Sequence, residues 1–111
     1  MSKEKRTYSK ITREALTLMG QQVKLARKQK KMSEKEMAAR AGIARSTLQK
    51  IEQGAPQVDI GFVFEVATLA GVPLFDVHAT SLAPHIERMS DKLALMPTYI
   101  RSSKREFNDD F

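Results

Sequence analysis

The sequence contains no cysteine and no tryptophan, and only 6% of its 111 residues are aromatic. Without cysteine the chain has no disulfide bonds and no thiolate ligands for a metal, which is typical of proteins in a reducing cytoplasm. It also lacks an apolar run long enough to cross a membrane, and no signal-peptide segment follows the basic start SKEKR. We therefore predict a cytoplasmic protein without membrane contact.

The length suffices for one small domain with extensions, and for no second core of useful size. Positive charge is concentrated in the N-terminal part of the chain. Residues 1–31 hold ten Lys or Arg against two Glu. Residues 32–58 carry a net charge of +1 and residues 59–111 a net charge of −3. A basic front half suits phosphate, because neutralising DNA charges releases counterions. For residues 1–10 we expect a flexible, solvated arm.

Residues 33–54 predict two short helices joined by a tight turn. Ser33 fits the N-cap of the first helix, Glu36 would close a capping box, and Gly42 marks the point where the backbone leaves the helix. Each helix also has an apolar face. In the first, Ala41 lies three and four residues after Ala38 and Met37, and Ile43, Leu48 and Ile51 supply the matching face across the turn. This is a helix-turn-helix pattern, although any helical hairpin can show the same periodicity.

Residues 32–54 resemble, position by position, the helix-turn-helix of the Xre and lambda-repressor family, and the similarity extends from about Val23 to Phe75. The resemblance implies an all-α fold: a five-helix lambda-repressor-like helix-turn-helix domain, with helical N-terminal and C-terminal extensions. It also implies that the second helix of the motif enters the major groove of DNA. We expect this DNA-binding domain at residues 11–77.

The first helix is expected from about residue 12 to residue 30, with Thr12 as its N-cap. It is longer than the family core needs, so its part before Gly20 is either a helical extension or a separate helix hinged at that glycine. The side chains expected to face the core are Val23, Leu25 and Ala26. The resemblance further implies a structural ion pair between Arg27 and Glu52.

The recognition helix is expected to begin after Ala44, and the first residues of such a helix reach base edges. Arg45 or Lys50 can bond guanine, and Gln49 can bond adenine. An exposed polar helix face without DNA contacts shows the same residues. The predicted DNA-binding residues are Lys28, Ser33, Glu34, Lys35, Ala44, Arg45, Ser46, Thr47, Gln49, Lys50, Gln53 and Gln57.

Two positions depart from the family pattern. Glu34 stands where the family usually carries glutamine, and its carboxylate is unfavourable near phosphate unless Lys35 offsets it or it accepts from cytosine N4. Ala44 replaces a hydroxyl that is common at the head of the recognition helix. Both departures leave open a domain that binds protein instead of DNA.

Asp59 is expected to cap a helix that extends to about Ala70. This helix is more apolar than one face can bury, which indicates either a subunit interface or a small core rich in aromatic residues. Residues 72–77 are expected to pack back as a short helical turn or a strand.

Residues 78–96 predict an amphipathic helix from Ser81 to Met96, with Pro84 in its first turn. Its apolar stripe fits core packing, dimer formation or partner contact. His78 and His85 have no carboxylates at ligand spacing, so we predict no metal site. A flexible tail is expected at residues 97–111, able to order on a partner. The predicted dimer or partner contacts are Leu82, Ile86, Met89, Leu93, Phe107 and Phe111.

A second, looser resemblance involves Gly-Val-Pro-Leu-Phe at 71–75, a charged helix ending in Leu-Ala-Leu-Met-Pro, and the final Asn-Asp-Asp-Phe. Together they are similar to HipB-type antitoxins, which accompany HipA-like kinase toxins. This resemblance implies a homodimer that binds an inverted-repeat operator, represses its own operon and sequesters a kinase toxin. The alternatives are a stand-alone Xre-type repressor and a protein-interaction module that kept the helix-turn-helix fold. No cofactor is expected, and no arrangement of residues suggests an enzyme.

Overall fold

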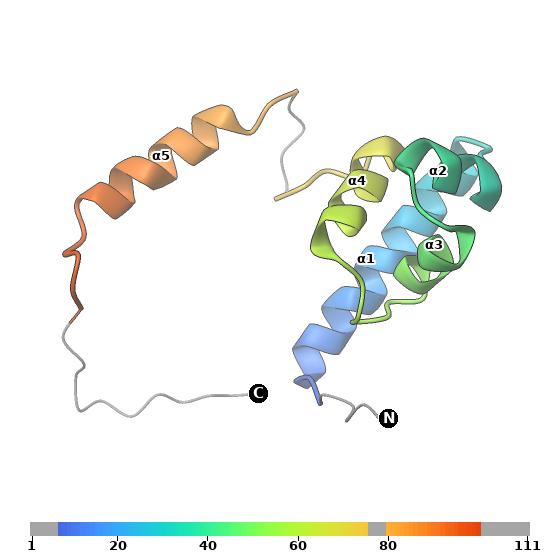
Figure 1. The fold of residues 1–111 in the computed structure, drawn as a ribbon, viewed down its shortest axis with the longest axis horizontal. Coiled ribbons are helices and arrows are strands. Elements are labelled where there is room, and N and C mark those ends of the chain that lie inside the picture. Colours follow the sequence, from blue (N-terminus) through green and yellow to red (C-terminus); the bar gives the residue numbers. More distant parts are fainter. Residues whose placement is uncertain (1–6, 76–79, 101–111) are drawn as a thin grey trace.

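The computed structural model describes residues 7–75 and 80–100. Within these residues, five α-helices follow one another: α1 (Lys10–Gln29), α2 (Glu34–Ala41), α3 (Arg45–Glu52), α4 (Ile60–Ala70) and α5 (Ala83–Ala94). Helices α1 to α4 pack together, whereas α5 stands apart from them (Figure 1). The predicted all-α architecture is confirmed. The fifth helix, α5, is the C-terminal extension, and the other four helices form the bundle.

Several predicted features lie outside the described residues. They are most of the N-terminal arm, His78, and the part of the C-terminal tail that contains Phe107 and Phe111. The arm and the tail therefore stay predictions.

Helix α1 is one continuous helix of 20 residues, without a hinge at Gly20. Its N-cap is Ser9 and not Thr12, so the predicted start was too late. The Ser9 backbone is extended, and its Oγ accepts a hydrogen bond from the Thr12 backbone N–H at 3.4 Å. A serine side chain that meets a first-turn amide in this way makes an effective cap, and the helix therefore begins at Lys10.

Gly20 brings α1 close to the end of α3. A Cβ atom built on Gly20 would lie 2.5 Å from the carbonyl oxygen of Ile51 and 2.6 Å from that of Glu52. Similarly, a Cβ on Gly54, whose φ is +79°, would lie 2.9 Å from Cα of Thr17. The N-terminal half of α1 therefore packs against the helix-turn-helix through two glycines, as part of the same bundle.

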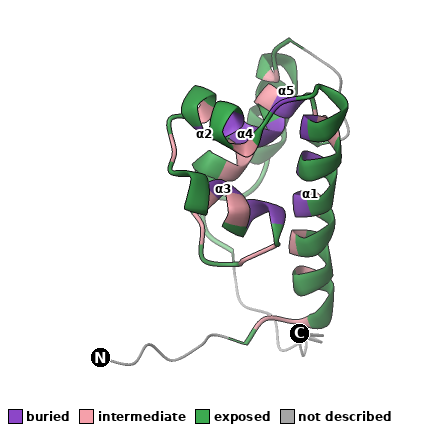
Figure 2. Cartoon of the chain, turned by 90° about the vertical axis from the view of Figure 1, so that its right-hand side faces the viewer, coloured by how far each residue is buried: buried purple, intermediate pink, exposed green. Residues whose placement is uncertain are grey.

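The hydrophobic core fills the space between α1, α2, α3 and α4 (Figure 2). Leu25 was expected to face this core, but 59% of its surface is exposed. Two helical steps turn a side chain by about 200°, so Leu25 points away from the side on which Val23 is buried. The buried apolar residues are Val23, Met32, Met37, Ala38, Leu48, Ile51, Val66, Ala67 and Ala70.

Helix α4 buries only part of its apolar surface. Ile60 is 68% exposed and Phe62 40% exposed, whereas Val66 is fully buried. Asp59 occupies the predicted N-cap position, but its side chain makes no capping hydrogen bond. After α4, residues 72–75 form no helix. Residues 72–77 were expected to pack back as a short helical turn or a strand. In their described part the helical turn is not formed, Leu74 makes an isolated β-bridge, and Val72 and Leu74 pack against the core.

Helix α5 is shorter than the predicted span and is exposed along its whole length. Pro84 lies in its first turn, and Ser81 Oγ accepts a hydrogen bond from the Ala83 backbone N–H at 3.1 Å. Ile86 and Leu93 are 64% and 65% exposed. The described residues include no helix with the length and apolar composition to cross a bilayer. They also include no group of three His, Cys, Asp or Glu side chains able to hold a metal.

Candidate nucleic-acid interface

Helices α2 and α3 form the two arms of the predicted motif. Ser33 caps α2, since its Oγ accepts from the Glu36 backbone N–H at 3.0 Å. The reciprocal half of the expected capping box is not formed, and the Glu36 carboxylate accepts from Arg40 Nη2 at 3.4 Å. The turn begins at Gly42, whose φ of 71° and ψ of 31° lie in the left-handed region. Glycine adopts this conformation without steric cost.

Helix α3 has one apolar face and one polar face. Leu48 and Ile51 are 0% and 4% exposed and hold the helix against the core. Fully burying a leucine contributes about 1.5–3 kcal/mol, so this face anchors α3 firmly. The other face is open to solvent: Arg45, Ser46 and Lys50 are exposed, and Thr47 and Gln49 are half-buried. The side chains that can contact DNA are therefore presented on a fixed helix.

A buried ion pair joins α1 to the end of α3. Arg27 Nε donates to Glu52 Oε2 at 2.7 Å, and Arg27 Nη2 donates to Glu52 Oε1 at 3.0 Å. Both residues are buried, at 5% and 8% exposure, and the hydrogen bond to Glu52 raises the pKa of Arg27. Arg27 Nη1 also donates to the carbonyl oxygen of Met32 at 2.8 Å. One guanidinium therefore fixes α1, the segment before α2 and the end of α3 together.

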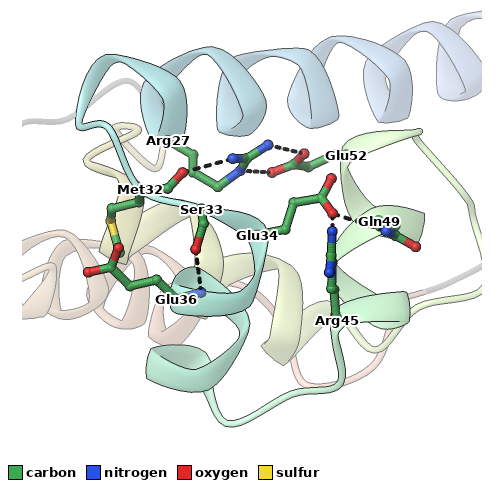
Figure 3. Close-up of polar contacts among 8 residues, drawn as sticks. All are labelled: Arg27, Met32, Ser33, Glu34, Glu36, Arg45, Gln49 and Glu52. Carbon is green, nitrogen blue, oxygen red and sulfur yellow. Dashed lines mark hydrogen bonds and ion pairs between the residues drawn. The ribbon is translucent and has the colours of Figure 1, made fainter.

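A second polar cluster lies at the start of α2 and α3 (Figure 3). Glu34 Oε1 accepts from Arg45 Nε at 2.9 Å and from Gln49 Nε2 at 3.0 Å. These hydrogen bonds, from Gln49 first and then Arg45, hold the pKa of Glu34 below its ordinary value. The negative charge of Glu34 is thus stabilised by hydrogen bonds from two residues of α3 and not by Lys35.

The comparisons with known proteins address this same part of the chain. Residues 23–77 match the family model described as "Helix-turn-helix". The matched residues include α2, the left-handed turn at Gly42 and α3, which together form a helix-turn-helix. Over 86 residues, which are 78% of this chain, the sequence is 28% identical to the uncharacterized HTH-type transcriptional regulator y4dL of Sinorhizobium fredii. The match covers 43% of that protein, so the chain spans less than half of its length.

The helix-turn-helix domain brings some of the predicted DNA-binding residues together. Glu34, Arg45 and Gln49 form one cluster, and Ser46 and Lys50 lie exposed on the same helix as the last two. The remaining predicted residues are spread over other segments. Lys28 is exposed in the last turn of α1, Lys35 in the first turn of α2, and Gln53 and Gln57 in the loop after α3.

Two contacts of the helix-turn-helix domain were missed by reasoning from the sequence. One is the pairing of Glu34 with Arg45, which are eleven residues apart. The signal available for it was the opposite charge of two side chains at the starts of the two motif helices. The other is the close approach at Gly20, for which the sequence offers no signal except a glycine inside a helical pattern.

Helix α3 lacks a side-chain cap, because its N-cap is Ala44. We expect Ala44→Ser to raise the free energy of unfolding by about 1 kcal/mol, since serine at an N-cap accepts a hydrogen bond from a first-turn amide. Urea unfolding monitored by circular dichroism measures this change. The matched control is Ser33→Ala, which removes the cap of α2 and is expected to lower stability by a similar amount. Unchanged stability of Ala44→Ser would contradict the prediction.

Proposed function

We propose that this protein is a sequence-specific DNA-binding transcriptional regulator, and that α3 is its recognition helix. The observation that carries the proposal is the helix-turn-helix domain itself, in which α3 buries Leu48 and Ile51 and leaves its polar face open. A helix held in this way can enter the major groove and present its first residues to base edges. The name of the Sinorhizobium relative, a transcriptional regulator, supports the same function.

The charge distribution supports binding to the phosphate backbone. The excess of Lys and Arg lies in residues 1–31, which include the exposed Lys28. Contacts with phosphate position a protein on the duplex, whereas contacts with base edges give it sequence preference. The proposal therefore assigns affinity mainly to the lysines and base selection to α3.

A salt series tests the proposal. Binding to the DNA upstream of the protein's own gene is compared with binding to a scrambled duplex of equal length. A preference for the upstream DNA that survives physiological salt supports a specific regulator. Equal and steeply salt-dependent binding to both duplexes would mean that the basic residues only attract phosphate, and would favour a protein-interaction module instead.

Two single variants separate the two kinds of contact. We expect Arg45→Ala to cost about 1–3 kcal/mol on the preferred site and to relax selection at one base pair. Lys28→Ala is expected to weaken binding to every duplex alike and to reduce the salt slope by about 1. Fluorescence anisotropy on the preferred site and on its single-base variants measures both effects. If the two variants weakened binding to all duplexes equally, the roles given to Arg45 and Lys28 would be wrong.

The proposal includes a homodimer formed through α5. The exposed apolar side chains Ile86, Met89 and Leu93 are 64%, 57% and 65% exposed, and a second copy of α5 is the occupant that we assign to them. The helix carries two acidic and two basic side chains besides His85, so an antiparallel copy can oppose unlike charges. A two-fold dimer would bind an inverted-repeat operator with half-sites about 34 Å apart. Sedimentation velocity on the full chain tests this, and a monomer at micromolar concentration would contradict it.

The antitoxin role, with autorepression and a HipA-like kinase toxin as partner, is proposed on the sequence resemblance at residues 71–75, at the end of the C-terminal helix and at the chain end. Deletion of residues 97–111 tests it in the native host. Loss of a copurifying kinase-like protein, with DNA binding unchanged, would support the antitoxin. An intact set of partners after the deletion would favour a stand-alone repressor.

A further inference from the structure

We propose that Glu34 positions the base-reading side chains of α3, so that Arg45 reads a guanine and Gln49 an adenine on neighbouring base pairs. The inference rests on the proposed function, because it names the bases that the recognition helix selects. Glu34 would make no base contact of its own. Its role would be to hold two side chains in the geometry that base recognition requires.

A single carboxylate oxygen of Glu34 joins the three side chains of the cluster. Glu34 Oε1 accepts both hydrogen bonds, from Arg45 Nε at 2.9 Å and from Gln49 Nε2 at 3.0 Å (Figure 3). Both donors therefore lie within hydrogen-bond distance of a single point. Base pairs in DNA are stacked about 3.4 Å apart, so two side chains anchored at one point can reach neighbouring pairs.

Glu34 is itself held in place. It is the first residue of α2 and directly follows the cap residue Ser33. Only 26% of its side-chain surface is exposed, against 63% for Arg45. A partly buried carboxylate at the start of a fixed helix is a rigid support for a longer, more exposed side chain. The pairing also neutralises the charge of Glu34, which would otherwise repel phosphate.

The hydrogen bond to Glu34 leaves both Nη groups of Arg45 available to bind guanine. Only Nε is engaged, and within residues 7–75 and 80–100 neither Nη1 nor Nη2 has a hydrogen-bond partner. The two Nη groups form a planar fork that matches the O6 and N7 acceptors of guanine. An arginine fixed at Nε also loses less conformational entropy when it binds a base.

Gln49 keeps the groups that adenine requires. Its Nε2 carries two hydrogens, and the bond to Glu34 uses one of them. The other N–H and the Oε1 atom remain, and these can bond N7 and the N6 amino group of adenine. Because Glu34 accepts and does not donate, it also fixes which end of the Gln49 amide faces it. The carbonyl end is therefore left for a base.

Matched variants of α2 test the inference. Glu34→Ala removes the support, whereas Glu34→Gln keeps an oxygen acceptor at the same place and removes the charge. The control is Glu36→Ala, because Glu36 lies in the same first turn and its side chain pairs with Arg40 and not with α3. Circular dichroism melts show whether each variant is folded. Sites selected from a randomised duplex pool give the base preference of each variant. Fluorescence anisotropy on duplexes that differ at one base pair gives, for each position, the ratio of the affinity for the preferred base to that for another base.

We expect wild type and Glu36→Ala to prefer guanine at one position and adenine at its neighbour by about tenfold each. Glu34→Gln should keep this preference and bind all duplexes somewhat more tightly. Glu34→Ala should reduce both ratios to about twofold or less. A merely structural role would lower affinity for all duplexes and leave the ratios unchanged. In an Arg45→Ala background, Glu34→Ala should no longer alter selection at the guanine position.

Three results would overturn the inference. Glu34→Ala with the ratios of wild type would show that Arg45 and Gln49 need no support. Tighter binding of Glu34→Ala to all duplexes, with unchanged ratios, would show that Glu34 only repels phosphate or restrains Arg45 away from DNA. Selection of other bases at these two positions would show that the side chains read a different pattern. A wild-type protein that prefers no duplex would instead overturn the proposed function, and this inference with it.

Discussion

Replacing Arg27 by methionine is expected to lower the free energy of unfolding by about 3–5 kcal/mol, because Glu52 would remain as a buried carboxylate without its partner. Arg27 supplies both hydrogen bonds to Glu52 and a third to the carbonyl oxygen of Met32. Removing it leaves polar atoms of two different segments unsatisfied. Urea unfolding followed by circular dichroism measures the change, with a constant m value as the check on two-state behaviour.

The double variant Arg27→Met/Glu52→Leu is the control for this prediction. With both charges replaced by apolar side chains of similar volume, we expect stability to return to within about 1–2 kcal/mol of wild type, since a buried ion pair adds little net stability over apolar packing. If the single variant unfolds at the same urea concentration as wild type, Glu52 is not buried in the folded protein. If the double variant is as unstable as the single one, the bond to Met32 matters more than the ion pair.

Replacing Gly20 by alanine is expected to lower the free energy of unfolding by about 2–3 kcal/mol. The added Cβ would lie 2.5 Å from the carbonyl oxygen of Ile51 and 2.8 Å from the carbonyl carbon of Glu52. These are backbone atoms at the end of a helix that is anchored by buried side chains, so they cannot move aside as a flexible side chain would. Separation of α1 from α3 would also strain the bond between Arg27 and Glu52. The gain in helix propensity, about 1 kcal/mol, offsets only part of this cost.

Gly61→Ala provides the matched control. Gly61 is also helical, but a Cβ atom there would meet nothing within 4 Å. We therefore expect this substitution to raise the free energy of unfolding by about 0.5 kcal/mol through lower entropy of the unfolded chain. Thermal melts of both variants under one set of conditions make the comparison. Stabilisation by Gly20→Ala would show that α1 does not approach α3 as closely as the structure has it.

Local sequence signals predicted the helix-turn-helix well. A glycine at position 42, a serine at position 33 and apolar residues at helical spacing each act within a few residues of the chain. Caps, turns and amphipathic faces depend on such short-range chemistry, and the structure has Ser33 as a cap and Gly42 in the left-handed region. The start of α1 was predicted wrongly: the cap was assigned to Thr12, whereas Ser9, three residues earlier, caps the helix.

Contacts between distant residues were less predictable. The burial of Leu25 was predicted from its apolar side chain. Which side of α1 faces the core is decided by the packing of this helix on α3 and α4, and Leu25 lies on the side that is exposed to solvent. In the same way, Glu34 was interpreted as unfavourable near phosphate unless Lys35 offset its charge or it accepted a hydrogen bond from cytosine. Its pairing with Arg45 and Gln49 depends on how the turn places the start of α3 beside the start of α2.

The sequence by itself predicted two helices joined by a glycine turn, because helical periodicity, caps and a left-handed glycine depend on short segments, and its resemblance to the Xre and lambda-repressor family predicted the all-α fold. It also determined where the positive charge lies. Only the tertiary structure decided that Gly20 is a contact and not a hinge, and that Glu34 pairs with the side chains of α3. The physical reason is that these features arise between residues brought together by packing, where distances of a few tenths of an ångström decide between contact and clash.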